Sequence, residues 1–353
     1  MANGDTSPSR VGQINGAGDV DALFLKKFSG EILQTFEESN VFKALHTVRT
    51  IENGKSAQFP VTGIASASYH TPGENIADAG NSYLSDINKA EKVITIDKML
   101  LASTFLSNID DVKNHYDIRS VYANELGKAL AVRFDTAMAK VFVAAARSAA
   151  AVTGGKTGGI LDVSANAMGD IADSADDGDN SDPTGAELVA ALFTAAQKLD
   201  ENDVPSDGRF AVLRPQEYYK LITGGAGELA ISTSAVNKDV GGLGSIASGS
   251  IPQVAGISIY KSNHIPSTDL SAVATGDGEA SNDVFGAGGI GYNGDFTNTL
   301  GVVSHSAAVG TVKLLDLATE SEYQIERQGT LFVAKYAMGH GVLRPECAIE
   351  LQK

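Results

Sequence analysis

Residues 116–148 read YDIRSVYANELGKALAVRFDTAMAKVFVAAARS and contain the longest amphipathic pattern in this 353-residue chain. Apolar and small side chains recur there at every third or fourth position, which is the spacing of one face of an α-helix. At ~1.5 Å per residue this helix would be ~50 Å long, several times the length of a mean globular helix. We therefore expect an elongated domain that is built along a spine helix.

Two β-prone segments precede the spine and flank a polar stretch. Residues 55–67 and 89–97 are rich in β-branched and aromatic side chains, whereas residues 68–88 between them are mostly polar. This arrangement predicts a hairpin of two paired strands with a long tip. An isolated two-stranded ribbon is only marginally stable in water, so we expect the hairpin to lie on another protein surface.

The first forty residues divide into a polar arm and an amphipathic segment. Residues 1–19 are rich in Gly, Ser, Asn and Asp, and they predict a mobile arm because they bury too little apolar surface to offset chain entropy. Residues 20–40 predict a helix that is interrupted at Gly30. Its apolar positions at helical spacing are Phe24, Leu25, Phe28, Ile32, Leu33 and Phe36. Such a helix either forms the outer layer of its own domain or binds a partner.

The chain after the spine alternates helices and strands. Residues 149–183 are dominated by Gly, Asp, Ser and Asn, and they predict a long exposed loop. Beyond this loop the patterns predict helices at 186–199 and 215–222 and strands at 209–214, 254–260, 299–306, 310–317, 330–337 and 347–351. These elements indicate an α/β or α+β domain that ends in a β-sheet region.

Composition disfavours several classes of protein. The chain has 27 Lys+Arg against 43 Asp+Glu and a formal net charge of −16, so it repels phosphate backbones and disfavours sequence-specific nucleic-acid binding. Cys347 is the single cysteine, which excludes an intramolecular disulfide and a zinc site of several cysteines. The longest apolar run, residues 141–146, is too short to cross a bilayer. We therefore expect neither secretion nor a membrane span.

Glycine-rich motifs raise the alternative of a nucleotide-dependent enzyme. Residues 154–157, which include Lys156, resemble the end of a phosphate-binding loop, but Ala150 stands where the first glycine is required. The glycines from Gly286 to Gly291 have the spacing of a dinucleotide fingerprint, but they lead into polar residues and not into a helix. The acidic run at 170–182 lacks the ligand spacing of a calcium loop, and the six histidines form no metal pair. The sequence thus predicts no cofactor, no metal and no catalytic set.

Six blocks of sequence, spread in this order over nearly the whole chain, resemble a known family. They are ALFLKKFSGEIL (22–33), GKSAQFPV (54–61), PGENI (72–76), EKVITID (91–97), AVGTVKLLDLA (308–318) and AKYAMGHGVLRPE (334–346). The blocks are similar to those of the major capsid proteins of short-tailed phages, the podoviruses of the T7 type. The resemblance implies an α+β fold, the tailed-phage capsid fold of the HK97 type.

The resemblance also implies how the chain is divided. The expected parts are an N-terminal arm (1–54), an extended hairpin loop (55–97), a peripheral domain with the spine helix and an exposed loop (98–184), an axial domain (185–307) and a return to the peripheral β-sheet (308–353). In this arrangement the spine and the hairpin extend one subunit across its neighbours.

A function follows from the same resemblance. Family members self-assemble as hexamers and pentamers into an icosahedral phage head that encloses double-stranded DNA, with a scaffolding protein and a portal protein as partners. The expected location is the virion, after assembly in the host cytoplasm, and no catalysis is expected. The alternatives are an encapsulin-like nanocompartment shell of the same fold and, outside the fold, the nucleotide-dependent enzyme.

Eight residues are expected at subunit interfaces: Phe24, Phe28, Ile32, Lys55, Phe59, Glu74, Glu91 and Arg344. The first three form an apolar stripe on the arm, which should dock on a neighbouring subunit. The next four belong to the hairpin, whose three charged residues are available for ion pairs with the adjacent subunit. Arg344 precedes a proline that holds it extended, and it either reaches across a junction between capsomers or caps its own sheet.

Overall fold

We describe the fold from a computed structural model. The residues whose structure is described are 40–76, 83, 87–96, 99–109, 118–163, 183–223, 249, 251–270 and 294–353. Residues 1–39, which include the polar stretch and the predicted helix positions Phe24, Phe28 and Ile32, lie outside these ranges, as do the acidic run at 170–182 and the glycines from Gly286 to Gly291.

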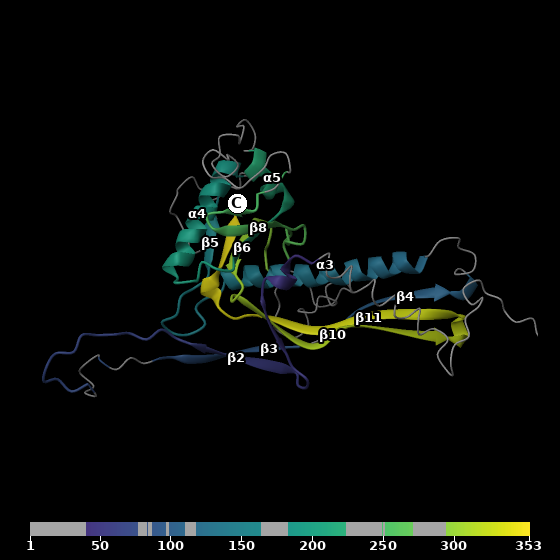
Figure 1. Cartoon of the computed structure of the whole chain (residues 1–353), viewed down its shortest axis with the longest axis horizontal. Helices are drawn as coiled ribbons and strands as arrows, with labels where there is room; N and C mark the ends of the chain where they lie inside the picture. The colour runs from purple at the N-terminus through teal and green to yellow at the C-terminus, as the bar shows by residue number, and fades with distance from the viewer. Residues whose placement is uncertain are drawn as a thin grey trace, which may run out of the picture.

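The predicted spine is confirmed as helix α3, Ile118–Ala146, which runs along the length of the molecule (Figure 1). Its buried face carries Leu130, Phe134, Met138 and Phe142, at most 3% exposed, as the helical spacing predicts. At the end of the helix the Ser148 hydroxyl donates to the Ala144 carbonyl at 2.5 Å, which satisfies one of the free carbonyls of the last turn.

The first sheet lies along the spine and has the strand order β1–β10–β11–β4. Its strands are β1 (Thr47–Thr50), β4 (Leu100–Ser107), β10 (Val309–Gln324) and β11 (Gly329–Val342). β1 is parallel to β10, and the other neighbours are antiparallel.

The long ribbon of β10 and β11 corrects the predicted strands at 310–317 and 330–337, which are too short. The polar run at 319–324 reads as a loop, yet its backbone pairs with β11 while alternate side chains face solvent. A 3-10 turn, Ile325–Arg327, and Gln328 in the left-handed conformation close the ribbon. β1 and β4 are absent from the sequence prediction.

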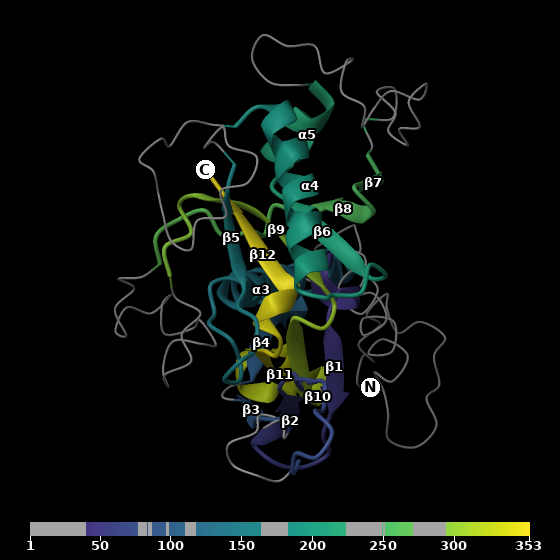
Figure 2. The ribbon, with the colours of Figure 1, turned by 90° about the vertical axis from the view of Figure 1, so that its left-hand side faces the viewer.

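The second sheet has six strands in the order β5–β12–β9–β6–β8–β7. They are β5 (Gly159–Asp162), β6 (Arg209–Leu213), β7 (Gln253–Val254), β8 (Ile257–Lys261), β9 (Thr299–His305) and β12 (Ala348–Gln352). Helices α4 (Gly185–Glu201) and α5 (Pro215–Thr223) lie at the same end of the molecule, and the hairpin lies at the other end (Figure 2). Thr184 and Glu187 form a capping box that begins α4.

Three predictions about the second sheet need correction. The single strand predicted at 254–260 is a hairpin of β7 and β8, because Ala255 and Gly256 both have positive φ (51° and 77°) and reverse the chain. The loop predicted at 149–183 contains β5, which pairs with the last strand of the chain. The expected return of 308–353 to one sheet is divided, because β10 and β11 join the first sheet whereas β12 joins the second.

The predicted hairpin forms from β2 (Ser56–Thr62) and β3 (Lys89–Thr95), paired from Ser56↔Thr95 to Thr62↔Lys89. The base of the hairpin is stabilised without a neighbouring subunit, because it packs on the first sheet of its own chain. Ile94 and Ile96 form a small apolar core there with other buried residues: Ala57, Val312, Ala337 and Leu343. Only the outer part of the hairpin is therefore expected to need the surface of another subunit.

Two glycines of β11 allow this packing. A Cβ on Gly339 would lie 2.3 Å from the Thr95 carbonyl oxygen, and one on Gly341 would lie 2.7 Å from Cγ1 of Ile94. Both distances are below any ordinary contact, so β3 crosses β11 at a place where only glycine fits.

Candidate assembly surfaces

The outer part of the hairpin exposes large apolar side chains. Gly63 donates to the Asn88 carbonyl at 2.7 Å, and the Asn88 side chain donates to the Thr153 carbonyl at 3.1 Å, which ties the hairpin to the loop after the spine. Beyond this point Ile64 and Ile76 are 63% and 54% exposed. Apolar groups that project this far from a subunit core are typical of an interface with another protein.

The structure places the predicted hairpin residues on two parts of this element. Phe59 is half-buried near the base, with the Arg49 guanidinium 5.6 Å from its ring centroid. Lys55, just before β2, and Glu91, on β3, are exposed, and within the described part of the chain neither has an ion-pair partner. Glu74 lies in the tip, where its carboxylate accepts a hydrogen bond from the Tyr83 hydroxyl.

Arg344 lies apart from these residues, at the start of the 3-10 turn Pro345–Cys347. Its backbone is extended (φ −125°, ψ 95°), as expected for a residue before proline, and its Nε lies 3.1 Å from Oε1 of Glu346. The carboxylate that it reaches in the free subunit thus belongs to its own chain. Its side chain is still 54% exposed and lines a cavity of about 370 Å³ between the outer end of β2, the loop after the spine and the second sheet.

Lys156 lines the same cavity and has a structural role. Its ammonium lies 2.7 Å from Oδ2 of Asp203 and donates to the Glu201 carbonyl at 2.5 Å, so it ties the loop after the spine to the end of α4.

Burial raises the pKa of the Cys347 thiol to about 11, which keeps it protonated and a poor nucleophile. Among the described residues, no cluster of three or more His, Cys, Asp or Glu side chains could hold a metal ion. No helix in the same ranges is long and apolar enough to cross a membrane.

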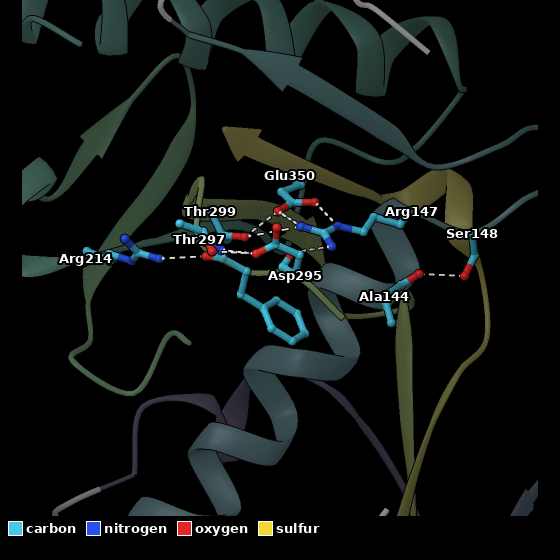
Figure 3. A network of polar contacts seen from close by, with 9 residues as sticks. Ala144, Arg147, Ser148, Arg214, Asp295, Thr297, Thr299 and Glu350 are labelled. Atoms are coloured by element: carbon cyan, nitrogen blue, oxygen red, sulfur yellow. Dashed lines mark hydrogen bonds and ion pairs between the residues drawn. The ribbon is translucent and has the colours of Figure 1, made fainter. Parts of the chain in front are cut away.

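An ion pair between a partly exposed arginine and a fully buried carboxylate joins the spine to the second sheet (Figure 3). Arg147, just beyond the end of α3, donates from Nε and Nη2 to the two oxygens of Glu350, at 2.6 and 2.7 Å. The Thr299 hydroxyl donates to the same carboxylate at 2.6 Å, and the Glu350 side chain is fully buried. Arg147 also donates to the Asp295 carbonyl at 2.7 Å and stacks 5.3 Å from the Phe296 ring. This network ties the end of α3 to β9 and β12 of the second sheet.

Asp135 on the spine binds the backbone of residues 41 and 42. Its carboxylate accepts the backbone N–H of Val41 at 2.8 Å and that of Phe42 at 3.4 Å. Its Oδ2 also lies 3.1 Å from Nδ1 of His264, in the loop after β8. Phe42 is fully buried and stacks on Phe142, so this segment is anchored in the core.

Two buried histidines lie between the spine and the first sheet. The Phe134 ring lies 6.0 Å from His46 and 5.2 Å from His340. Burial lowers the pKa of His46, although its hydrogen bond to the Phe42 carbonyl and the charge of Asp135 oppose this shift. Burial also lowers the pKa of His340 to about 3, and the neighbouring His46 adds to the shift. Both side chains are therefore neutral at pH 7.

Comparison with known proteins identifies the family. Residues 58–352 match the family model described as Gp10A-like major capsid protein. The chain belongs to this capsid protein family. It is 36% identical to the major capsid protein of Escherichia phage T7 over 340 residues, which cover 94% of this chain and 92% of that protein. It is 33% identical to the major capsid protein of Enterobacteria phage T3 over 358 residues, covering 99% and 97%.

A solved structure extends this comparison to the whole subunit. The capsid structure of the cyanophage P-SCSP1u superposes with a TM-score of 0.68 and 40% sequence identity, and the match covers 99% of both chains. The expected fold of this capsid protein, the α+β tailed-phage capsid fold of the HK97 type, is thereby confirmed. The nanocompartment shell and the nucleotide-dependent enzyme are not favoured by any of these matches.

Proposed function

We propose that this capsid protein assembles as hexamers and pentamers into an icosahedral head that encloses double-stranded DNA, and that it performs no catalysis. The observation that carries the proposal is the family match over nearly the whole chain. The shape of the subunit supports it, because the hairpin and the β10–β11 ribbon reach out at opposite ends of the molecule, where neighbours would lie (Figure 1).

The proposal includes partners and a division of the subunit. We expect a scaffolding protein and a portal protein during assembly in the host cytoplasm. The first sheet and the spine would form the peripheral domain, and the second sheet with α4 and α5 would form the axial domain at capsomer centres. The formal charge of −16 suits a container, because a strongly basic wall would bind the packaged phosphates tightly.

Electron microscopy of the purified full chain tests the proposal. We expect closed shells or rings of five and six subunits, because the hairpin tip exposes apolar surface that assembly would bury. Discrete small oligomers or monomers at concentrations where related shells assemble would contradict it. Shells that form only around a co-purified enzyme would favour the nanocompartment instead.

Charge reversal at the hairpin should weaken the shell without unfolding the subunit. Glu91 is exposed and lies opposite Pro60, with no ion-pair partner among the described residues, so its charge is available to a neighbour. Glu91→Lys is expected to lower the melting temperature of shells by a few degrees and leave that of free subunits unchanged, because an exposed pair contributes only ~0.2–1 kcal/mol but recurs in every subunit. Glu320→Lys is the matched control, because Glu320 pairs with Lys335 of its own chain at 2.6 Å. Equal shifts in subunits and shells would place Glu91 in an internal contact.

Replacing Arg344 should affect closure of the shell more than folding. Its pair with Glu346 is more than half exposed on the arginine side, so its loss should cost the subunit at most ~1 kcal/mol. If Arg344 exchanges this partner for a neighbour's carboxylate or carbonyl, Arg344→Ala subunits should form capsomers that fail to close into shells, as seen by sedimentation and microscopy. Normal shells from this variant would assign Arg344 to its own sheet.

A further inference from the structure

The cavity beside Arg344 has the size and the walls of a small-molecule site. Its volume of about 370 Å³ lies within the range of ~300–1,000 Å³ that is typical of ligand pockets. Val204 and Cys347 form its deep part, because they line it and are only 6% and 3% exposed. Ile64 of the outer hairpin and Val152 of the loop after the spine add further apolar side chains. The apolar body of a ligand can therefore be removed from water here.

Other polar side chains of the cavity already have partners in the fold. The Lys156 ammonium is held by the Asp203 carboxylate at 2.7 Å. Both ring nitrogens of His305 are engaged, because Nδ1 accepts the Ala307 N–H at 3.1 Å and Nε2 donates to the Asp207 carbonyl at 2.9 Å. These contacts hold the walls of the cavity in place.

Arg344 differs from these side chains, because the outer nitrogens of its guanidinium are unused. Its ion-pair partner Glu346 lies nearest to Nε, at 3.1 Å, and neither Nη1 nor Nη2 donates a hydrogen bond to any residue that the structure describes. The side chain is 54% exposed, so it lies where the cavity opens to solvent. The two outer N–H groups of a planar guanidinium match the two oxygens of a carboxylate.

We propose that this cavity binds a small carboxylate with an apolar body, of the kind that a medium-chain fatty acid provides. The carboxylate binds Nη1 and Nη2 of Arg344, and the chain points toward Val204 and Cys347. Such a ligand contacts both the outer end of β2 and the second sheet, so it holds the hairpin against the body of its own subunit. The inference concerns the free subunit and does not rest on the proposed function.

Titration calorimetry of unassembled full-length subunits tests the site with three probes. Octanoate carries both the chain and the carboxylate, whereas 1-octanol lacks the carboxylate and acetate lacks the chain. We expect octanoate to bind at one site per subunit with a Kd of about 0.1 mM, which is reasonable for a ligand of its size. Both other probes should bind at least ~10-fold more weakly, because each loses one of the two contacts.

Three variants assign the binding to this cavity. Arg344→Ala should weaken octanoate ~10-fold and leave 1-octanol unchanged, because only octanoate carries the carboxylate. Ala151→Phe places a large ring in the cavity and should weaken both probes by a similar factor. Ile76→Ser is the control, because Ile76 is 54% exposed on the hairpin but does not line the cavity, and it should change neither affinity.

The same measurements can overturn the proposal. It fails if the wild type shows no saturable binding of octanoate, or if octanoate and 1-octanol bind equally well. It fails also if octanoate binds Arg344→Ala as tightly as the wild type, a comparison that remains decisive if Ala151→Phe does not fold. Unchanged binding in a folded Ala151→Phe would place the ligand elsewhere and overturn it too. Because all measurements use free subunits, these failures would leave the proposed function untouched.

Discussion

Replacing Arg147 with Met is expected to lower the free energy of unfolding of the free subunit by about 3–5 kcal/mol, because it leaves a buried carboxylate without its charged partner. Glu350 is fully buried and accepts three hydrogen bonds, two of them from Arg147. The remaining donor, the Thr299 hydroxyl, is neutral and cannot balance the charge. Denaturant titration of unassembled subunits measures the change.

Two matched variants separate charge from packing. Arg147→Met/Glu350→Met removes both charges and should recover most of the stability, because a buried ion pair is often no more stable than apolar groups of similar volume. Lys335→Ala removes the more exposed pair with Glu320 and should cost less than ~1 kcal/mol. If Arg147→Met lowers the free energy of unfolding by less than ~1 kcal/mol, water solvates Glu350 after the substitution. The network would then contribute little to holding the spine on the second sheet.

The sequence predicts the elements that are determined by residues close to one another in the chain. The spine follows from periodicity and the paired strands of the hairpin follow from β-prone side chains, and both are confirmed, although β2 ends at Thr62 and not at residue 67. The errors come from pairing between distant segments. β5 is four residues long within a Gly-rich stretch, and it exists because β12, nearly two hundred residues later, pairs with it. The β7–β8 turn depends on Ala255 at positive φ, a conformation that alanine seldom adopts and that no pattern indicates.

Some residues of the candidate assembly surfaces could be predicted from the sequence, and others could not. The family resemblance pointed to the hairpin and to Arg344, because they lie in recognisable blocks of sequence. The sequence does not predict the roles of Asp135 and Arg147, because each binds partners about one hundred to two hundred residues away. A single charged residue on a helix also usually faces solvent. The one available signal was an acid or a base at a position that the helical period assigns to the buried side of α3, as for Asp135.

The subunit is expected to lose stability in mild acid because of its two buried histidines. The folded pKa of His340 is about 3 and that of His46 is also below its ordinary value, so between pH 6.5 and 3 the unfolded chain binds more protons than the folded one. Their contribution is therefore fully present above pH 6.5 and is lost as the pH falls toward 3. The slope is about 1.4 kcal/mol per pH unit for each histidine that stays neutral. Between pH 6.5 and 5 ordinary carboxylates are still ionised. Over this range the titration of His340 alone should lower the free energy of unfolding by about 2 kcal/mol.

His340→Gln isolates this effect, because glutamine can keep a hydrogen bond to Thr311 but does not titrate. The variant should start less stable at pH 7 but lose about 2 kcal/mol less than the wild type between pH 6.5 and 5, as measured by denaturant midpoints in unassembled subunits. Thr311→Val is the control, because it removes the 2.8 Å hydrogen bond to Nδ1 and leaves the histidine buried, so its pH slope should match the wild type. Asp135 and His46 face the same layer, and Asp135→Asn should steepen the slope, since its charge raises the pKa of His46. An unchanged slope in His340→Gln would mean that water or a rotated side chain satisfies the protonated ring inside the fold, and the acid sensitivity would then belong to other groups.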